Sequence, residues 1–436
     1  MKKLKISIIG LGFVGLSLAV TNAREGFFTI GVDSNKTKIK NLQNAKADFF
    51  EPNVSKYLKE SIKKNKILFT SDLKEILKTD ITFITVGTPS TKDGKIDLSS
   101  LKKVVSELKK ILKTKQKTHL VVIKSTVVPT TTLNEVLPII KNLKHVGLVV
   151  NPEFLREGSA INDLYHPHLI VIGHDNEKHY KILECYYKQF YKRLPEILKT
   201  NHTTAEMIKY ANNAFLATKI SYINSIANIC QQLPQVDVNT ISHAIGKDPR
   251  IGSQFLQAGP GFGGSCLPKD LSALIKFTDK FQDINSFFKA VENVNQLQSN
   301  QLIQMLKSMK LLNQNKIIAI LGLAFKKDTD DLREAVSIKL VNKLLKKQVK
   351  IRVHDPMALD NFKEIFKDKI SYHNKITDCI KGADCCIILT EWDAYKKLNT
   401  GILKNHMRKP NIIDARRVLD PSKFKELNYK AIGLGS

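Results

Sequence analysis

Short, mostly apolar runs alternate with longer amphipathic stretches along much of the chain. Residues 5–9, 29–32, 81–86 and 120–123 are rich in Ile, Val, Leu and Phe, and runs of this length are typical of buried strands. A helical pattern from about 14 to 26 separates the first two runs. Strands that alternate with helices indicate βαβ units, so the first half of the chain predicts a doubly wound parallel sheet.

The last third of the chain repeats this order. Residues 316–321 form an apolar run that ends in Gly322, a helical pattern covers about 334–347, and further apolar runs follow at 349–354 and 383–390. Weak internal symmetry of this kind predicts two similar α/β units, each able to hold a nucleotide. The glycine fingerprint of the first unit is incomplete in the second, so we expect side chains to hold the second nucleotide.

Residues 203–232 lie between these units and contain neither Gly nor Pro, with Ala, Ile, Leu and Phe at helical spacing. This pattern predicts one long helix. We expect the helix to join the two units and to offer an apolar face to a homodimer or a higher homo-oligomer. The predicted fold is α/β, with two Rossmann-like doubly wound domains at 1–200 and 301–436 and a central helical dimerisation region at 201–300.

Composition narrows the class of protein. The 436 residues carry a formal net charge of +28, and sixty of the 69 basic residues are lysines spread along the chain. A nucleic-acid binder usually concentrates its charge on one face and often uses arginine, so we expect no nucleic-acid partner. A basic nucleic-acid-binding protein is the non-enzymatic alternative.

No apolar run reaches the roughly 18 residues that span a bilayer, which predicts a soluble protein with no membrane partner.

The six cysteines form no Cys-x-x-Cys pair. This spacing argues against a zinc site and against a disulfide framework, and it favours a reducing cytoplasm. The pair His166 and His168 has no third ligand nearby in sequence, so we expect no metal site.

The first predicted strand runs into Gly10, Gly12 and Gly15, which reproduce the G-x-G-x-x-G fingerprint, and the second strand ends in Asp33. Gly10 permits the tight turn, Gly12 lets the backbone approach a pyrophosphate, and Gly15 lets helix and strand pack closely. An acid at position 33 accepts hydrogen bonds from a ribose diol and repels a 2′-phosphate. The pattern therefore predicts a dinucleotide site that prefers NAD to NADP.

Two later strands end in small or hydroxylated residues, Gly87-Thr88 and Ser125-Thr126. In a doubly wound sheet such strand ends face the ligand crevice.

A loop rich in Gly and Pro, residues 259–270, presents Cys266 ahead of a helix expected from about Asp270. A thiol near a helix N-terminus and Lys269 has the environment of a nucleophile. We interpret the other cysteines, at 185, 230, 379, 385 and 386, as small buried hydrophobes.

With these motifs in order, the chain resembles the UDP-glucose/GDP-mannose dehydrogenase family over almost its full length. The matching blocks are 10–15, 86–89, 124–126, 151–158, 205–213, 261–270, 322–326, 329–333, 390–392 and 414–416. The resemblance implies an NAD-dependent four-electron oxidation of a nucleotide sugar at C6, UDP-glucose to UDP-glucuronate, through a thiohemiacetal and a thioester on cysteine. GDP-mannose and UDP-N-acetylhexosamines are the alternative substrates, and the products of the family usually feed cell-surface polysaccharides.

The same resemblance assigns catalytic roles. Cys266 is the nucleophile, Asp270 and Thr126 position or activate the catalytic water, and Glu153 is the base for thioester hydrolysis. Lys209 and Asn213, four residues apart on one helix, stabilise the developing oxyanion. Fixed charges in a dry pocket suit that task.

The remaining expected contacts divide into two sets. The cofactor set is Gly10, Gly12, Phe13, Val14, Gly15, Asp33, Lys38, Gly87, Thr88, Thr126, Glu157, Lys269 and Arg333. The substrate set is Phe154, Leu155, Arg156, Glu157, Lys209, Asn213, Arg250, Phe255, Phe262, Gly263, Lys326 and Arg416. The resemblance further implies that Arg250 reaches into the site of a neighbouring subunit.

The chain departs from the family pattern at Thr130, where a glycine is usual, at His168, at Ala335-Val336 and at Ala415 beside Arg416. None of these changes removes an expected catalytic group. A second hypothesis keeps the fold without the thiol chemistry: a two-electron β-hydroxyacid-type dehydrogenase, which also uses a helix lysine and asparagine and is indifferent to loss of Cys266.

Overall fold

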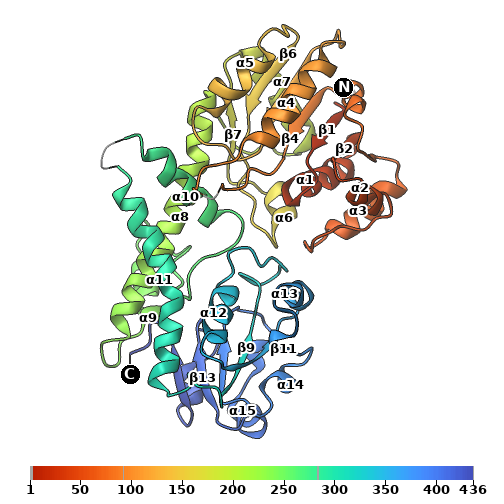
Figure 1. The fold of residues 1–436 in the computed structure, drawn as a ribbon. Coiled ribbons are helices and arrows are strands. Elements are labelled where there is room, and N and C mark those ends of the chain that lie inside the picture. The colour runs from red at the N-terminus through yellow and green to blue at the C-terminus, as the bar shows by residue number, and fades with distance from the viewer. Residues whose placement is uncertain (1–2, 92, 282–283, 436) are drawn as a thin grey trace. The chain divides into compact units, whose positions relative to one another are not determined.

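A computed structural model describes residues 3–91, 93–281 and 284–435 of the chain. These residues form two compact units, which divide between Asn212 and Asn213. Each unit is built on one sheet flanked by helices (Figure 1). The α/β class and the pair of doubly wound sheets predicted from the sequence are confirmed.

The sheet of the first unit has eight strands in the order β3-β2-β1-β4-β5-β6-β7-β8. All neighbours are parallel except β6 and β7, which pair antiparallel. The strands are β1 (Ile6–Ile9), β2 (Thr29–Val32), β3 (Ile67–Thr70), β4 (Ile81–Ile84), β5 (His119–Ile123), β6 (Val146–Val150), β7 (Ile170–Gly173) and β8 (Ile197–Thr200). The first six follow the order of a dinucleotide-binding fold.

The helices of this unit lie between its strands along the chain. They are α1 (Phe13–Arg24), α2 (Lys36–Gln43), α3 (Val54–Lys63), α4 (Ser99–Leu112), α5 (Leu137–Ile140), α6 (Ala160–Tyr165) and α7 (Glu177–Phe190). Along β1, Ile6 and Ile8 belong to one apolar cluster and Ile9 to another. Because successive side chains of a strand point to opposite faces, this alternation shows that both faces of the sheet are covered.

The second unit contains a six-stranded, wholly parallel sheet in the order β11-β10-β9-β12-β13-β14. The strands are β9 (Ile317–Leu321), β10 (Lys350–His354), β11 (Ser371–Tyr372), β12 (Cys385–Ile388), β13 (Asn411–Asp414) and β14 (Asn428–Ala431). Its flanking helices are α12 (Val336–Leu345), α13 (Leu359–Phe366), α14 (Ile376–Ile380) and α15 (Thr400–His406). The order of connections is the same as in the first unit, so the internal symmetry is confirmed.

One long helix, α8 (His202–Cys230), runs through the boundary between the units, close to the predicted 203–232. After it come α9 (Val238–Gly246), α10 (Leu267–Thr278) and α11 (Ser286–Ser308). In the second unit α11 lies beside α8 (Figure 1), and the Ser221 hydroxyl donates to the Val291 carbonyl at 2.8 Å. The helix expected from about Asp270 begins earlier, at Leu267, because Pro268 suits its first turn.

In both sheets a glycine with positive φ follows the first strand, at the point where the strand order reverses. Gly10, at φ 92°, follows β1, and a Cβ built on it would lie 2.9 Å from the Val86 Cα; Gly322, at φ 96°, follows β9, and its Cβ would lie 2.5 Å from the Thr390 Cβ. A side chain fits neither the space nor the backbone conformation. Each glycine therefore permits the first strand of its unit to turn against the end of the fourth.

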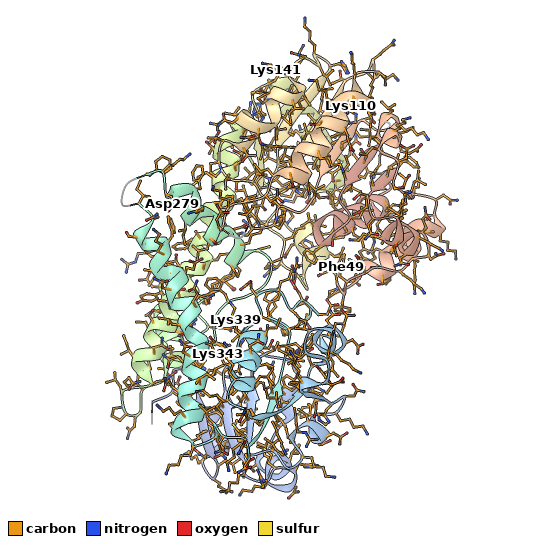
Figure 2. All side chains as sticks on the ribbon, viewed as in Figure 1. Phe49, Lys110, Lys141, Asp279, Lys339 and Lys343 are labelled. Carbon is orange, nitrogen blue, oxygen red and sulfur yellow. The ribbon has the colours of Figure 1, made fainter. Side chains whose placement is uncertain are left out.

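Lysine side chains extend outward from both units (Figure 2), and Lys110 and Lys141, labelled there, are exposed. Among the described residues, none of the helices is both long enough and apolar enough to cross a membrane.

Candidate active site

The carboxyl end of β1 forms a cradle for a phosphate group. A Cβ on Gly15 would fall 1.9 Å from the Gly10 carbonyl oxygen, whereas a Cβ on Gly12 would meet no atom within 4 Å. Phe13 and Val14 open α1 directly after this turn. The helix therefore begins with free amides beside open space, which is the arrangement that binds a pyrophosphate.

Asp33 stands at the end of β2 beside this cradle. Its carboxylate accepts hydrogen bonds from the Leu11 amide at 2.8 Å and from the Asn35 amide at 2.9 Å. Lys38 reaches the same turn, with its ammonium 3.4 Å from the Leu11 carbonyl and 2.9 Å from Asp48. These bonds fix a carboxylate where a ribose diol would lie in a dinucleotide fold.

The ends of β4 and β5 meet at the same edge of the sheet. The Thr88 hydroxyl donates to the Thr126 carbonyl at 2.7 Å, and the Ser125 hydroxyl donates to the Val86 carbonyl at 2.7 Å. The structure therefore brings together the strand-end motifs that the sequence assigned to the ligand crevice.

Glu153 and Lys209 form a buried ion pair within the first unit. The Lys209 ammonium lies 3.0 Å from Glu153 Oε1 and 2.7 Å from the Glu153 carbonyl oxygen, while Glu153 Oε2 accepts from the Leu155 amide at 2.6 Å. Burial opposes ionisation of Glu153, but the Lys209 charge, the Leu155 amide and a second buried lysine, Lys124, hold the pKa of the carboxyl below its ordinary value. The carboxylate is therefore ionised at neutral pH.

Lys124, which follows β5, was not singled out from the sequence. Its ammonium is buried and donates to Asn151 Oδ1 at 3.0 Å. Burial and the Lys209 charge lower the pKa of Lys124 to about 8, although Glu153 favours the charged form. A lysine placed directly after an apolar strand, where the strand enters the crevice, is the sequence signal that marks it.

Residues 154–158 continue from Glu153 as a loop held by its own contacts. The Phe154 ring lies 5.4 Å from the Lys209 ammonium, and Arg156 forms a two-pronged ion pair with Asp163. The Glu51 carboxylate accepts from the Gly158 and Ala160 amides at 2.6 and 2.8 Å. These anchors fix the loop that the resemblance assigns to the sugar.

The second unit carries the cysteine. Cys266 is half-buried at the N-terminal end of α10, with Sγ 3.4 Å from the Ser265 hydroxyl. The Asp270 amide donates to the Cys266 carbonyl at 2.8 Å. A thiol at this place lies near the positive end of the helix dipole, which favours the thiolate.

Asp270 is buried one turn into α10 and joins two groups named by the sequence analysis. Asn213 of α8 donates to its Oδ2 at 2.6 Å, and the Lys269 ammonium lies 2.6 Å from its Oδ1. The structure thus joins Asn213 to Asp270, which lies 57 positions further along the chain, and to its neighbour Lys269 through that carboxylate.

The loop before Cys266 is fixed from three sides within its unit. Asn224 of α8 accepts from the Gly259 amide at 2.8 Å, and Asn295 of α11 accepts from the Phe262 amide at 2.7 Å. The Gly264 amide donates to the Arg333 carbonyl at 2.8 Å, and a Cβ on Gly263 would lie 2.4 Å from the Glu334 carbonyl oxygen. The loop is therefore rigid without being a helix or a strand, and sequence analysis missed the two asparagines that hold it.

Arg416 follows β13 at the carboxyl edge of the second sheet. Its guanidinium donates to the carbonyl oxygens of Leu389 and Phe325, each at 3.0 Å. The ammonium of Lys326, the next residue after Phe325, lies 5.6 Å from the centre of the Phe325 ring. The expected cations at positions 326 and 416 thus both contact Phe325.

Asp355 ends β10 as Asp33 ends β2, but its carboxylate is fully engaged. It accepts from the Leu323, Ala324, Met357 and Ala358 amides and from the Trp392 indole. No acceptor capacity is left for a ribose, which agrees with the expectation that other side chains hold the second nucleotide.

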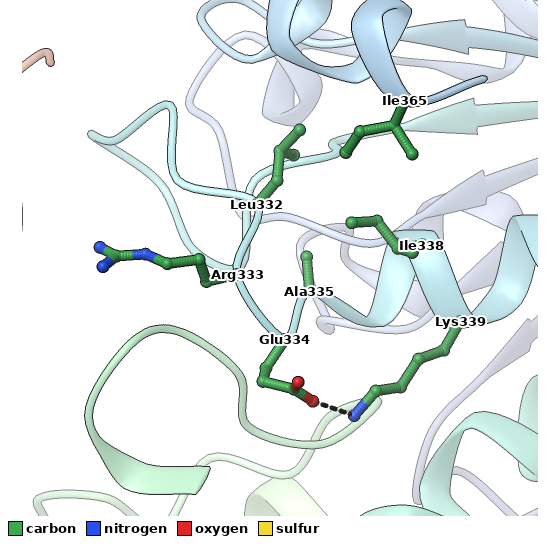
Figure 3. A pocket seen from close by; sticks show the side chains of 7 residues that line it. All are labelled: Leu332, Arg333, Glu334, Ala335, Ile338, Lys339 and Ile365. Atoms are coloured by element: carbon green, nitrogen blue, oxygen red, sulfur yellow. Dashed lines mark ion pairs between the residues drawn. The ribbon is translucent and has the colours of Figure 1, made fainter. Parts of the chain in front are cut away.

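Arg333 precedes α12 beside a hollow of about 330 Å³ lined by Leu332, Ala335, Ile338 and Ile365 among others. Figure 3 shows the guanidinium pointing away from these apolar side chains, and Arg333 pairs with Asp331 at 2.7 Å.

Two further residues of the expected substrate set lie after α9. Arg250 is exposed and pairs with Asp248 at 2.6 Å. Phe255 has a left-handed backbone at φ 63°.

Four of the remaining cysteines, at 230, 379, 385 and 386, are buried as expected. Burial raises the pKa of Cys379 to about 12 and raises those of Cys385 and Cys386 further. The prediction was wrong for Cys185, which is partly exposed on α7 and accepts a bond from Gln189.

The expected site residues therefore gather in two groups, one in each unit. The first unit brings together the glycine cradle, the strand ends and the Glu153–Lys209 pair, and the second unit brings together Cys266, Asp270 and Asn213. The roles of the individual residues remain predictions.

Three domain descriptions of one family match successive parts of the chain. They are the NAD binding domain of the UDP-glucose/GDP-mannose dehydrogenase family at residues 4–191, its central domain at 203–297 and its UDP binding domain at 319–421.

Individual relatives match over full length. The chain is 38% identical to the UDP-glucose 6-dehydrogenase of Haloferax volcanii, covering 98% of this chain and 100% of that protein, and 37% identical to the UDP-glucose 6-dehydrogenase YwqF of Bacillus subtilis, covering 99% and 98%. A solved UDP-glucose dehydrogenase from Pyrobaculum islandicum is 32% identical with a TM-score of 0.91, covering 99% of this chain and 98% of that one. A UDP-D-ManNAc dehydrogenase from Pyrococcus horikoshii is 27% identical with a TM-score of 0.86, covering 99% of each chain.

Proposed function

The chain belongs to the UDP-glucose/GDP-mannose dehydrogenase family, and from that membership we propose that it oxidises UDP-glucose at C6 to UDP-glucuronate. The protein is an NAD-dependent oxidoreductase of nucleotide sugars. The proposal concerns the sugar and the part that each residue plays. The feature that carries it is Cys266, a half-buried thiol at the start of α10 that a rigid loop presents.

The residues of the first unit fit NAD. The open space beside Gly12 and the close packing of Gly15 against Gly10 leave room for a pyrophosphate at α1. Asp33, fixed by two amides, would hold the ribose, and Lys38, Gly87 and Thr88 line the same edge of the sheet. When bound, NAD+ accepts one hydride in each of two successive oxidations.

We assign the chemistry as follows. A base removes the proton of the C6 hydroxyl, and the C6 carbon loses a hydride, which leaves the aldehyde. The Cys266 thiolate adds to the aldehyde carbon and forms a thiohemiacetal, and loss of a second hydride and of the hydroxyl proton gives a thioester. Water then attacks the thioester, which releases the carboxylate and regenerates the thiolate.

The charged side chains match these steps. Lys209 and Asn213 donate to the oxygen on C6 as negative charge develops there. Glu153, ionised by its neighbours, removes a proton from the attacking water, and Asp270 with Thr126 positions that water. Glu153 and Lys209 lie in one unit and Cys266 and Asp270 in the other, so the proposal assigns the two groups to one reaction.

The nucleotide end is assigned to the second unit. Lys326 and Arg416 supply positive charge at the carboxyl edge of its sheet, where a diphosphate would be bound. The resemblance adds Arg333 on the cofactor side and Phe154 to Glu157 around the sugar. The relatives with the UDP-glucose 6-dehydrogenase name favour UDP-glucose over GDP-mannose or a UDP-N-acetylhexosamine.

We also propose that the protein works as a homodimer or a higher homo-oligomer in the cytoplasm. Phe215, Tyr222 and Ile229 are seven residues apart on α8 and are 63%, 53% and 56% exposed. Such spacing keeps three large apolar side chains on one helix face, a face that a second copy of the chain would cover. Arg250, 87% exposed at its side chain, would then contribute to the partner's site.

The test is a screen of UDP- and GDP-sugars with NAD+, in which NADH formed and sugar consumed are both measured. We expect about two NADH for each UDP-glucose, one for each hydride step. Cys266→Ala should release no acid, and the matched Cys185→Ala variant should turn over normally. One NADH per sugar, unchanged in Cys266→Ala, would instead support a two-electron dehydrogenase, and normal acid release by Cys266→Ala would rule out the thioester.

A further inference from the structure

Lys124 is a second buried lysine near the Glu153–Lys209 pair. The Lys124 ammonium lies 3.0 Å from Asn151 Oδ1 and 3.4 Å from the Asn151 carbonyl oxygen. It belongs to the first unit, follows β5, and is buried. A buried lysine is rare unless it has a partner, so its position calls for a reason.

The two lysines hold one short segment at two places. Lys124 contacts the carbonyl of Asn151, and Lys209 contacts the carbonyl of Glu153, two residues further along. The backbone between them includes Pro152, whose ring fixes φ. The segment that carries the Glu153 carboxylate is therefore fixed by two ammonium groups from different elements.

Asn151 connects Lys124 to the core. Its Oδ1 also accepts from the Tyr187 hydroxyl of α7 at 2.5 Å, and its Nδ2 donates to the Val171 carbonyl of β7 at 2.7 Å. Burial raises the pKa of Tyr187, so the phenol is a neutral donor. Every hydrogen-bonding atom of the Asn151 side chain is thus engaged, which leaves the segment little freedom.

We propose that Lys124 is a positioning residue, which holds Asn151 and the strand end so that the Glu153 carboxylate stays against Lys209. This rests on the proposed role of Glu153 as the hydrolytic base. Lys124 acts through Asn151 and through its charge, and it does not itself touch the substrate.

The charges around Glu153 agree with this role. Lys124 and Lys209 are two buried cations that share one buried carboxylate, and each lowers the pKa of that carboxyl. Removing Lys124 takes away one of the two charges that favour the ionised base. A purely structural lysine would affect folding but would not be coupled to the ionisation of Glu153.

The first experiment is a double-mutant cycle that needs no activity. Lys124→Met keeps the length of the side chain and removes its charge, and Glu153→Gln removes the carboxylate. We expect Lys124→Met to lower the thermal midpoint by about 2–4 °C more in the wild-type background than in Glu153→Gln, because in the latter it removes one of two neighbouring positive charges that no longer have a carboxylate between them. Equal losses in the two backgrounds would overturn the proposal.

The second experiment is the pH profile of kcat. Loss of a nearby positive charge raises the pKa of a carboxyl, so the acid limb of Lys124→Met should move to higher pH by about one unit. Lys124→Arg, which keeps the charge, should restore the wild-type limb. Lys115→Met removes a half-buried lysine of the same unit that donates to His119, and should leave the limb unchanged.

The outcomes separate the two proposals. If wild-type protein oxidises no nucleotide sugar, the proposed function fails, and the cycle still decides whether Lys124 and Glu153 are coupled. If the wild type is active but the acid limb of Lys124→Met is unmoved, Lys124 has no positioning role.

Discussion

The ammonium of Lys209 lies 3.0 Å from Glu153 Oε1 and 2.7 Å from the carbonyl oxygen of the same residue, and both side chains are buried. The two residues are 56 positions apart, one on α8 and one just after β6. The pair places a fixed cation against an ionised carboxylate in the interior of the first unit.

The Glu153 carboxylate accepts bonds from two donors, and glutamine keeps its shape without its charge. We expect Glu153→Gln to fold and to form NADH in a first turnover, but to release acid about 10²–10⁴-fold more slowly, which is the usual contribution of a general base. Mass spectrometry of the stalled enzyme should show an acyl group on Cys266. An unmodified cysteine at steady state would assign the base to another residue.

Gly12 and Gly15 separate cofactor binding from folding. A Cβ on Gly12 meets no protein atom within 4 Å, whereas a Cβ on Gly15 falls 1.9 Å from the Gly10 carbonyl oxygen. We therefore expect Gly12→Ala to keep the wild-type thermal midpoint and to lose NAD affinity, and Gly15→Ala to lose several kcal/mol of stability through overpacking. Calorimetric titration with NAD+ and a thermal scan of each variant test this pair. Wild-type NAD affinity in Gly12→Ala would remove that glycine from the cofactor site.

Thr130 has φ 75°, in the left-handed region that a β-branched residue rarely adopts, and it stands where the family usually has glycine. Strain of this kind costs about 1–3 kcal/mol, which exceeds the backbone entropy that glycine adds to the unfolded chain. We expect Thr130→Gly to stabilise the protein by about 1 kcal/mol. Its neighbour Thr131 has φ −57° and donates to the Val128 carbonyl, so the control variant Thr131→Gly should destabilise. Denaturant midpoints measure both.

His119 is buried at the amino end of β5. Its Nε2 is 2.7 Å from the Thr82 hydroxyl, and its Nδ1 is 2.8 Å from the Lys115 ammonium. Burial and the Lys115 charge lower the pKa of His119 from 6.5 to about 3. The unfolded chain therefore binds a proton below pH 6.5 that the folded chain does not.

The contribution of His119 is complete above pH 6.5 and is lost as the pH falls toward 3, by about 1.4 kcal/mol per pH unit. His119→Gln should flatten the fall in thermal midpoint between pH 6.5 and 4. His243→Gln, at an exposed position, is the matched control. Identical slopes for all three proteins would show that His119 ionises in the folded state.

The fold could be predicted from the sequence because its determinants are local. Apolar runs of strand length, glycines at the ends of β1 and β9, and a 29-residue helix without Gly or Pro each restrict the nearby backbone directly. The antiparallel pairing of β7 with β6 was not predicted, nor was the start of α10 at Leu267 instead of about Asp270. Strand direction depends on a distant partner, and a helix start depends on which residues cap it.

The sequence by itself also predicted which residues carry chemistry, since the thiol, the acids and the glycine cradle belong to motifs. It did not determine how those groups are held. Lys124 beside Asn151, Asn224 and Asn295 on the cysteine loop, and the fully bonded Asp355 came only from the tertiary structure. A polar side chain takes its pKa and its hydrogen bonds from the atoms that surround it in space, and those atoms come from elements far apart in the chain.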